Sequence, residues 1–228
     1  MLTFRINAFL VFMIISFAVN GQQISGSLQM DAGFAIGEFR NEVGQLIVPQ
    51  VSLNGMYAIP KIPIEIGATL GYGIYGTALT KSGNVFAGVD QNSRIRRNNN
   101  LVHLGGVLRL VPDFNMGIRP FLEGHLGAVH TYTRSRIREN RLAEPIASGT
   151  ERYDWAAIYR LGGGVMVPLT SERNTFLELK LLYVNTGEME YLTKSDAHYS
   201  PEGDLSLIVR RSSFTMLQPG ISLRYYFD

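Results

Sequence analysis

The amino-acid sequence predicts an all-β fold, an eight-stranded antiparallel up-and-down transmembrane β-barrel. Three observations predict it: apolar and polar residues alternate in eight segments, long and short connections alternate between them, and the apolar faces carry no charged residue. The chain of 228 residues is 46% hydrophobic and only 18% charged, whereas soluble domains are roughly 25% charged. A single domain is expected at this length.

Residues 1–21 are predicted to be a cleaved signal peptide, which leaves 22–228 as the barrel domain. Arg5 supplies a positive n-region, and Phe9–Val19 is an apolar run of 11 residues, too short to span a bilayer. Small residues, Val19 and Gly21, precede the expected cleavage site. A retained N-terminal anchor helix is the alternative.

Composition excludes several classes of protein. The chain has no Cys, which excludes a lipoprotein anchor, a disulfide scaffold and a zinc–thiolate site. After the signal peptide no segment approaches the ~20 apolar residues of a spanning helix. The net charge of +2 is too small to indicate nucleic-acid binding.

The eight strands follow from the period of two. In Ile24–Ile36 the even positions are apolar or glycine and the odd positions are mostly small or polar, so one face is apolar and the other polar. The predicted strands are 24–36, 50–59, 64–76, 101–111, 118–132, 154–167, 175–184 and 213–227. They hold about half of the mature chain, against roughly 20–25% strand in soluble domains.

The connections between these strands alternate in length without exception. They contain 13, 4, 24, 6, 21, 7 and 28 residues, and the short ones begin at Pro60, Pro112 and Pro168. Outer-membrane barrels have short periplasmic turns, long extracellular loops and both termini in the periplasm. A soluble β-sandwich is not expected to have long loops at one end and short turns at the other.

The outward faces of the predicted strands are apolar along their whole length. None of their positions is Asp, Glu, Lys or Arg, and His130 is the only imidazole. An Arg or Lys at the bilayer midplane costs about 2–4 kcal/mol, so this pattern indicates contact with lipid. Aromatic residues form two predicted girdles, Tyr72, Tyr132, Trp155, Tyr159 and Tyr183 at the loop ends and Tyr57, Tyr225 and Phe227 at the turn ends.

These features, together with the final segment Gly220–Asp228 (GISLRYYFD), resemble the small bacterial outer-membrane β-barrel family of the OmpA/OmpX or PorT-like kind. The resemblance covers essentially all of the mature chain. It implies an integral protein of the cell outer membrane, with Tyr225 and Phe227 as the signal that the barrel-assembly machinery reads. Phe227 lies one place before the end rather than last. The motifs are patterns, so they imply a fold and a location but no activity.

The inward faces carry equal numbers of acids and bases. An eight-stranded barrel has room only for its own side chains, and buried charges persist when they are paired. The sequence therefore predicts a plugged polar lumen held by an ion-pair network of Asp31, Glu65, Arg109, Arg119, Glu123, Arg160, Glu178, Lys180 and Arg224, with Asp154 also inward. A gated proton or small-ion path through the same residues is the alternative.

The inward histidines suggest a metal site and the glycine runs suggest a phosphate site, and each pattern also has a simpler interpretation. His103 and His125, with Glu123, are potential metal ligands, but no further ligand has suitable spacing, so polar filling of the lumen is favoured. The glycines of the central strands, including Gly162–Gly164, lie inside strands with no following helix, so they relieve crowding rather than bind phosphate. No cofactor or metal is expected.

The sequence favours a protein without catalytic activity. His130 with Asp154, on neighbouring strands, is the only arrangement that resembles a base with its orienting acid, and His198 lies near Ser200 without an acid. We expect a structural, adhesive or accessory subunit that exposes four long extracellular loops. The alternatives are an outer-leaflet lipid-modifying enzyme or a narrow small-solute channel.

Five arginines predict contacts with lipopolysaccharide phosphates above the aromatic girdle at the loop ends, which we call the upper girdle. The sequence pattern predicts that the fifth strand continues past Tyr132 with Arg134, Arg136 and Arg138 on its outward face, while the fourth strand, read backward, adds Arg94 and Arg96. Guanidinium groups bind phosphate in bidentate fashion. The alternatives are a solvated loop, or a bulge in the Asn98–Asn100 run that turns Arg94 and Arg96 inward. The expected partners are thus outer-membrane lipid and lipopolysaccharide, and a protein that contacts the loops, but no nucleic acid.

Overall fold

The computed structural model describes residues 24–81, 94–114, 117–138, 144–193, 196–199 and 205–227. The predicted signal peptide, residues 1–21, lies outside these ranges. Among the helices of these ranges, none has the length and apolar character needed to cross a membrane.

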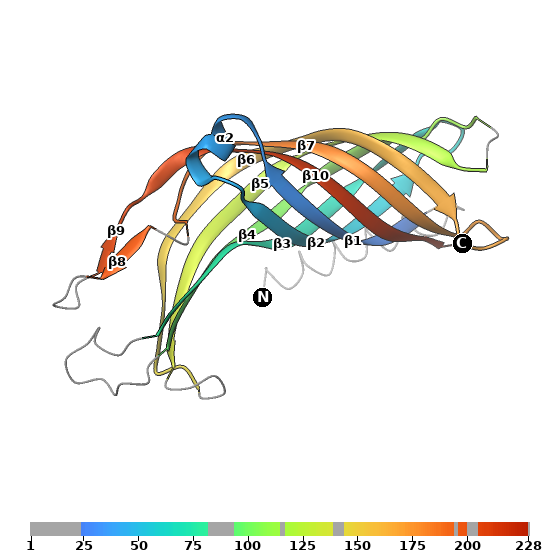
Figure 1. The fold of residues 1–228 in the computed structure, drawn as a ribbon. Helices are drawn as coiled ribbons and strands as arrows, with labels where there is room; N and C mark the ends of the chain where they lie inside the picture. Colours follow the sequence, from blue (N-terminus) through green and yellow to red (C-terminus); the bar gives the residue numbers. More distant parts are fainter. Residues whose placement is uncertain are drawn as a thin grey trace, which may run out of the picture.

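Eight long antiparallel strands close into a barrel in the order β1-β10-β7-β6-β5-β4-β3-β2 (Figure 1). The strands are β1 (Ile24–Ala35), β2 (Ile47–Ala58), β3 (Ile64–Lys81), β4 (Arg94–Leu110), β5 (Arg119–Arg138), β6 (Ala147–Pro168), β7 (Thr175–Tyr191) and β10 (Arg210–Phe227). The first and last strands close the ladder, with Ile24 opposite Phe227 and Ala35 opposite Met216. The predicted fold class is confirmed.

Each predicted strand is present, but several extend further toward the loops than the sequence pattern indicates. β5 continues to Arg138 and contains 20 residues, and β6 begins at Ala147 and contains 22. A tilted strand needs only roughly 9–11 residues to cross the hydrocarbon. The alternation rule ends a strand where its outward residues become polar, whereas backbone pairing continues above the lipid.

Two connections that the alternation pattern predicts as loops contain secondary structure. α2 (Gly37–Val43) follows β1, and the short strands β8 (Ala197–Tyr199) and β9 (Leu205–Leu207) form a separate hairpin at the same end of the barrel (Figure 1). Gly37 and Gly44 border α2 with φ of +58° and +72°, a region that glycine adopts most easily. A helix of seven residues is too short to show a helical period in the sequence.

The two faces of each strand differ as the alternation predicts. On β1, Gln29 and Asp31 are buried, while Leu28 and Met30 on the opposite face are 47% and 58% exposed. At the loop end, the outward residues Tyr72, Val102, His130 and Trp155 are register neighbours on β3 to β6. The rings of His130 and Trp155 stack with their centroids 4.3 Å apart. The outer surface is therefore an apolar belt bordered by aromatic side chains.

The interior is filled in layers along the barrel axis. Near the turns, an apolar cluster is formed by Phe121, Met166, Phe176 and Tyr226. Near the loops, a second cluster is centred on Phe39 of α2, whose ring stacks on Phe214 with centroids 4.4 Å apart. The charged and polar residues of the lumen include Arg109 and Glu178, which have exposures of 1% and 0%.

Candidate functional site

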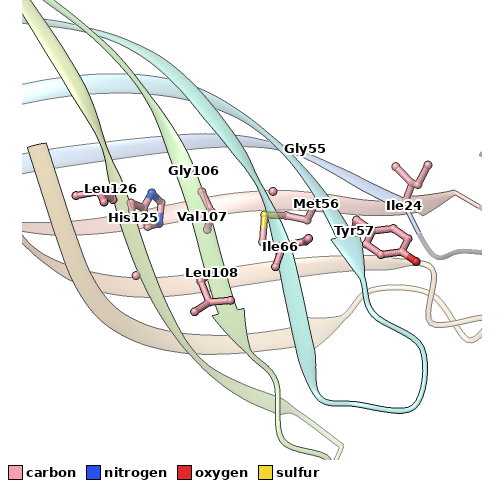
Figure 2. Close-up of a pocket in the computed structure, with 12 residues that line it drawn as sticks. Ile24, Gly55, Met56, Tyr57, Ile66, Gly106, Val107, Leu108, His125 and Leu126 are labelled. Carbon is pink, nitrogen blue, oxygen red and sulfur yellow. The ribbon is translucent and has the colours of Figure 1, made fainter. Parts of the chain in front are cut away.

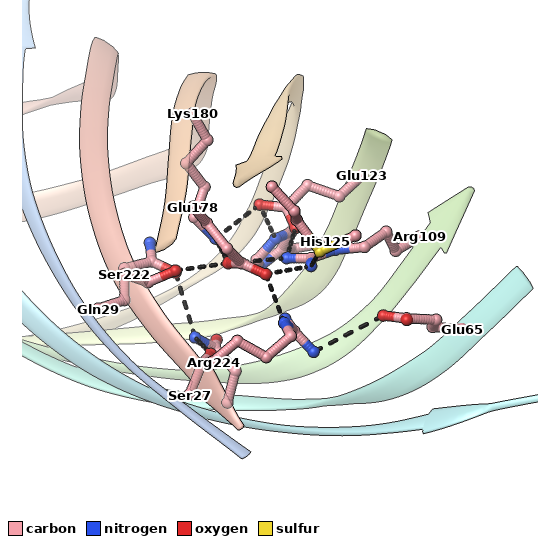
Figure 3. A network of polar contacts seen from close by, with 12 residues as sticks. Ser27, Gln29, Glu65, Arg109, Glu123, His125, Glu178, Lys180, Ser222 and Arg224 are labelled. Carbon is pink, nitrogen blue, oxygen red and sulfur yellow. Dashed lines mark hydrogen bonds and ion pairs between the residues drawn. The ribbon is translucent and has the colours of Figure 1, made fainter. Parts of the chain in front are cut away.

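The charged side chains of the lumen form an ion-pair network around Glu178 (Figure 3). Arg109 donates from Nη1 to Glu178 Oε1 at 2.6 Å and from Nε to Glu123 Oε2 at 2.9 Å. Lys180 Nζ donates to Glu123 Oε1 at 2.9 Å. β4, β5 and β7 each supply part of this network because the residues occupy inward positions at similar height.

Arg224 extends the lumen network across the closing strand of the barrel. It donates to Glu178 from Nε and to Ser25 Oγ from Nη1, the latter at 2.7 Å. Its Nη1 also lies 3.6 Å from Glu65 Oε2, and the Tyr226 hydroxyl donates to Glu65 Oε1 at 2.7 Å. The network thus connects strands from both sides of the lumen.

Three residues predicted for the network lie apart from these ion pairs. Arg160 is 3% exposed, and its two terminal nitrogens have no hydrogen-bond partner in the described part of the chain. Asp31 is buried and accepts hydrogen bonds from Gln29 Nε2 at 2.7 Å. The guanidinium carbon of half-buried Arg119 lies 5.1 Å from the centroid of the Phe176 ring. These residues fill the lumen without joining the Glu178 cluster.

Of the two inward histidines, His125 contacts the lumen network and His103 does not. His125 Nε2 lies 3.3 Å from Glu123 Oε1, and His103 Nε2 lies 3.5 Å from Ser52 Oγ. Among the described residues, no three or more His, Cys, Asp or Glu side chains form a group that could hold a metal ion.

His130 and the Asp154 carboxylate do not form the pair considered from the sequence. His130 Nδ1 is 3.1 Å from the backbone oxygen of Asp154. The carboxylate instead accepts hydrogen bonds from the backbone N–H groups of Glu190 and Trp155, each at 2.8 Å. Ser200 and the side chain of His198 lie outside the described residues.

Four arginines gather around one outward pocket above the upper girdle. Arg94, Arg96, Arg136 and Arg138, which we call the arginine face, line a pocket of about 370 Å³ together with Thr77, Leu79 and Asn98. The pairing of β4 with β5 is regular, so the bulge that would turn Arg94 and Arg96 inward does not interrupt this ladder. Arg134 lies on the same face opposite Asn98, exposed and outside the pocket.

The arginine face places like charges directly across the ladder. Arg94 is opposite Arg138, and Arg96 is opposite Arg136. Like charges at such positions destabilise a sheet. No carboxylate is among the described residues that line the pocket, whereas the neighbouring inward Arg97 is paired with Glu151 at 2.7 Å. An anion with several oxygens would interact favourably with guanidinium groups arranged in this way.

Sequence reasoning missed the contacts that hold α2 over the barrel. Arg210 Nη1 donates to the backbone oxygen of Glu42 at 2.8 Å, and its Nε donates to Asp196 at 2.8 Å. Burial alone would raise the pKa of Asp196, but hydrogen bonds from Arg210 and Thr193 outweigh it and hold that pKa below its ordinary value. The contact therefore stays charged at neutral pH. No sequence signal joins residues so far apart.

An apolar hollow of about 1100 Å³ lies near the turn end of β1 to β5 (Figure 2). Outward glycines such as Gly55 and Gly106 leave it open, and Ile66, Leu108 and Leu126 flank it. These outward side chains offer no charged group that would select a ligand.

Comparison with known proteins adds solved structures of low similarity. No protein-family model and no curated protein matches the chain. Neisserial surface protein A is 12% identical with a TM-score of 0.43, and covers 91% of this chain and 98% of its own. A major outer membrane protein from Thermus thermophilus is 14% identical with a TM-score of 0.46, over 90% and 99%. The attachment invasion locus protein Ail of Yersinia pestis is 12% identical with a TM-score of 0.41, over 90% and 97%.

The identity of the chain rests on its own geometry. A closed ladder satisfies the backbone of every strand without water, which is the condition for crossing a bilayer with strands. The outward side chains of this ladder form an apolar belt between aromatic rows, with Leu126 72% exposed and Trp155 62% exposed. The chain is an integral outer-membrane protein of the eight-stranded β-barrel class.

Proposed function

We propose that the protein is a non-catalytic barrel with a closed lumen, which acts through its extracellular surface as a structural, adhesive or accessory subunit. The filling of the lumen at two levels carries this proposal. The network around Glu178 occupies the half near the turns, and the Phe39 cluster lies beneath α2 at the other end. A channel would need a path through both.

A closed lumen predicts the absence of a steady pore current. Purified protein in planar bilayers at neutral pH should give no conductance above that of the protein-free bilayer, because side chains occupy the lumen in both halves. Incorporation is checked by heat-modifiable migration of the same preparation on a gel. A steady, large open-pore current would favour the small-solute channel instead.

We further propose that the arginine face contacts the phosphates of lipopolysaccharide in the outer leaflet. The grouping of four arginines around one pocket, with Arg96 directly opposite Arg136 across the β4–β5 ladder, supports this proposal. Such a group suits an anion with several oxygens, and it lies above the aromatic row that contains Tyr72. Arginine is suited to phosphate because its planar fork donates two parallel hydrogen bonds.

Removing one arginine pair should weaken retention of lipopolysaccharide. In the double variant Arg96→Ser/Arg136→Ser, we expect the phosphate retained per barrel after detergent washing to fall by about tenfold or more, because each charged hydrogen bond contributes roughly 1.5–3 kcal/mol. The matched control is Arg134→Ser/Arg211→Ser, which removes the same charge outside the pocket. Phosphate assay of the washed proteins measures retention. Equal retention in both variants would rule out the arginine face.

A further inference from the structure

The wall of the barrel separates between β2 and β3 at the extracellular end. The β2–β3 ladder ends where Gln50 lies opposite Gly73. Above this point the first residues of β2, Ile47 to Pro49, pair with β1, and the upper part of β3 pairs with β4. Within the described residues, the two strands thus border a seam in the upper wall, and β6 and β7 likewise stop pairing with each other above Ile158 and Thr186.

Two local features of β2 and β3 account for the seam. Pro49 has no N–H to donate, so the upper part of β2 has one hydrogen-bond donor fewer. On β3 the register with β4 shifts between Ile74 and Gly76. This bulge leaves Tyr75 inside the barrel, at 3% exposure, while Leu79 above it is 50% exposed.

A cavity of about 490 Å³ occupies the seam. Ile47, Pro49 and Ile74 line it from the β2 and β3 edges, and Ile47 is 56% exposed. Tyr75 and Tyr191, both members of the apolar cluster under α2, line its inner side. Val43 and Leu46, at the end of α2 and just after it, also line the cavity, and its polar lining residues are Gln45, Thr77 and Thr193. The volume is within the range of small-molecule sites, and the lining is mostly apolar.

The seam cavity adjoins the arginine face. Thr77 lines both pockets, and its hydroxyl donates to Asn98 Oδ1 at 3.3 Å within the arginine pocket. The seam lining on β3 begins at Ile74, two residues above Tyr72, and the arginine pocket follows from Thr77 and Leu79. From the aromatic row outward, the seam therefore comes first and the arginine pocket second. An apolar cavity beside a cationic pocket matches a molecule that has an alkyl chain and an anionic headgroup.

We propose that the seam binds one alkyl chain of a phosphorylated outer-leaflet amphiphile whose phosphate lies on the arginine face. This inference rests on the proposed function of the arginine face and adds the part of the ligand that enters the barrel wall. The chain lies against Ile47 and Ile74, with its end toward Tyr75 and Tyr191. A free phosphate ion would use the arginine face alone and leave the seam empty.

The test uses the full-length mature protein in phosphatidylcholine vesicles that contain a small fraction of phosphatidic acid with a diazirine in its acyl chain. After illumination, cross-linked residues are mapped by mass spectrometry. Cross-links to the seam, residues 43–49 and 74–77, should exceed those to the outer wall by about tenfold. A phosphatidylcholine probe with the same chain should show no such preference.

Two variants separate the chain site from the phosphate site. Ile74→Trp fills the cavity and should remove the seam cross-links while phosphate retention stays at the level of the unmodified protein. Leu70→Trp is the matched control on the same strand and face, and it should change neither readout. Heat-modifiable migration checks that each variant folds.

Three outcomes would overturn the inference. Cross-links spread evenly over the outer wall of the unmodified protein would show that the seam is not occupied, with the arginine proposal intact. Seam cross-links that survive Ile74→Trp would place the chain elsewhere. Seam cross-links undiminished in Arg96→Ser/Arg136→Ser would show that chain entry does not depend on the phosphate, and unchanged retention there would remove the arginine proposal as well.

Discussion

Replacing Glu178 with Gln is expected to lower the free energy of unfolding of the barrel by about 3–5 kcal/mol. The Glu178 carboxylate is fully buried and accepts hydrogen bonds from Arg109, Ser222 and Arg224. An amide of the same size leaves two buried guanidinium groups without their shared counter-charge. Urea titration of the protein in lipid vesicles, followed by gel migration, measures the change.

The control for Glu178→Gln is Glu188→Gln. Glu188 pairs with Arg211 at 3.1 Å, but the two side chains are 64% and 68% exposed. Exposed pairs contribute roughly 0–1 kcal/mol, so this variant should unfold close to the unmodified midpoint. If both variants lost equally little stability, the lumen network would not be what holds the barrel closed.

The second large effect is expected at Gly127, where Gly127→Ala should destabilise or block assembly of the β4–β5 pair. A Cβ atom at Gly127 would overlap the carbonyl oxygen of Leu104 and lie 2.5 Å from the Cα of Gly105. These are backbone atoms, so the strands themselves must separate. We expect a loss of about 3 kcal/mol, the upper end of ordinary overpacking.

Gly55→Ala is the matched control for the glycine variant. Gly55 is also a strand glycine, but a Cβ there meets no atom within 4 Å. Folding yield into vesicles and the urea midpoint of both variants measure the effect. If Gly127→Ala folded as well as Gly55→Ala, close backbone approach would not be the reason for glycine at this position.

The sequence was sufficient to predict the strands and the direction in which their side chains point. Alternation with a period of two depends only on neighbouring residues, so it fixes the faces of Asp31 and Glu178 without knowledge of the fold. It cannot give the pairs between side chains, because these depend on register and barrel shape. Arg160 has the same inward parity as Arg109, yet of these two only Arg109 forms ion pairs with carboxylates within the described chain.

The extracellular end was harder to predict because its determinants are single residues. The alternation of side chains along the strands predicts Arg96 and Arg136 on one face. This prediction requires a regular β4–β5 ladder, and a bulge in the Asn98–Asn100 run would have broken that regularity. The seam follows from Pro49 and from a bulge at Tyr75 that no sequence pattern indicates. α2 docks through Phe39, one buried side chain in a helix of seven residues.

The continuation of β5 and β6 above the aromatic row has a consequence for antibodies or phages that bind this surface. From Tyr132, β5 runs six residues further to Arg138, about 20 Å along the strand at ~3.3 Å per residue. Paired strands are stiff, so this extension of the β5–β6 ladder presents its exposed side chains on a fixed backbone above the aromatic row. Substitution of an exposed side chain on this extension breaks no backbone hydrogen bond of the ladder, so the chemistry of the surface can vary while the strand pairing below it is kept.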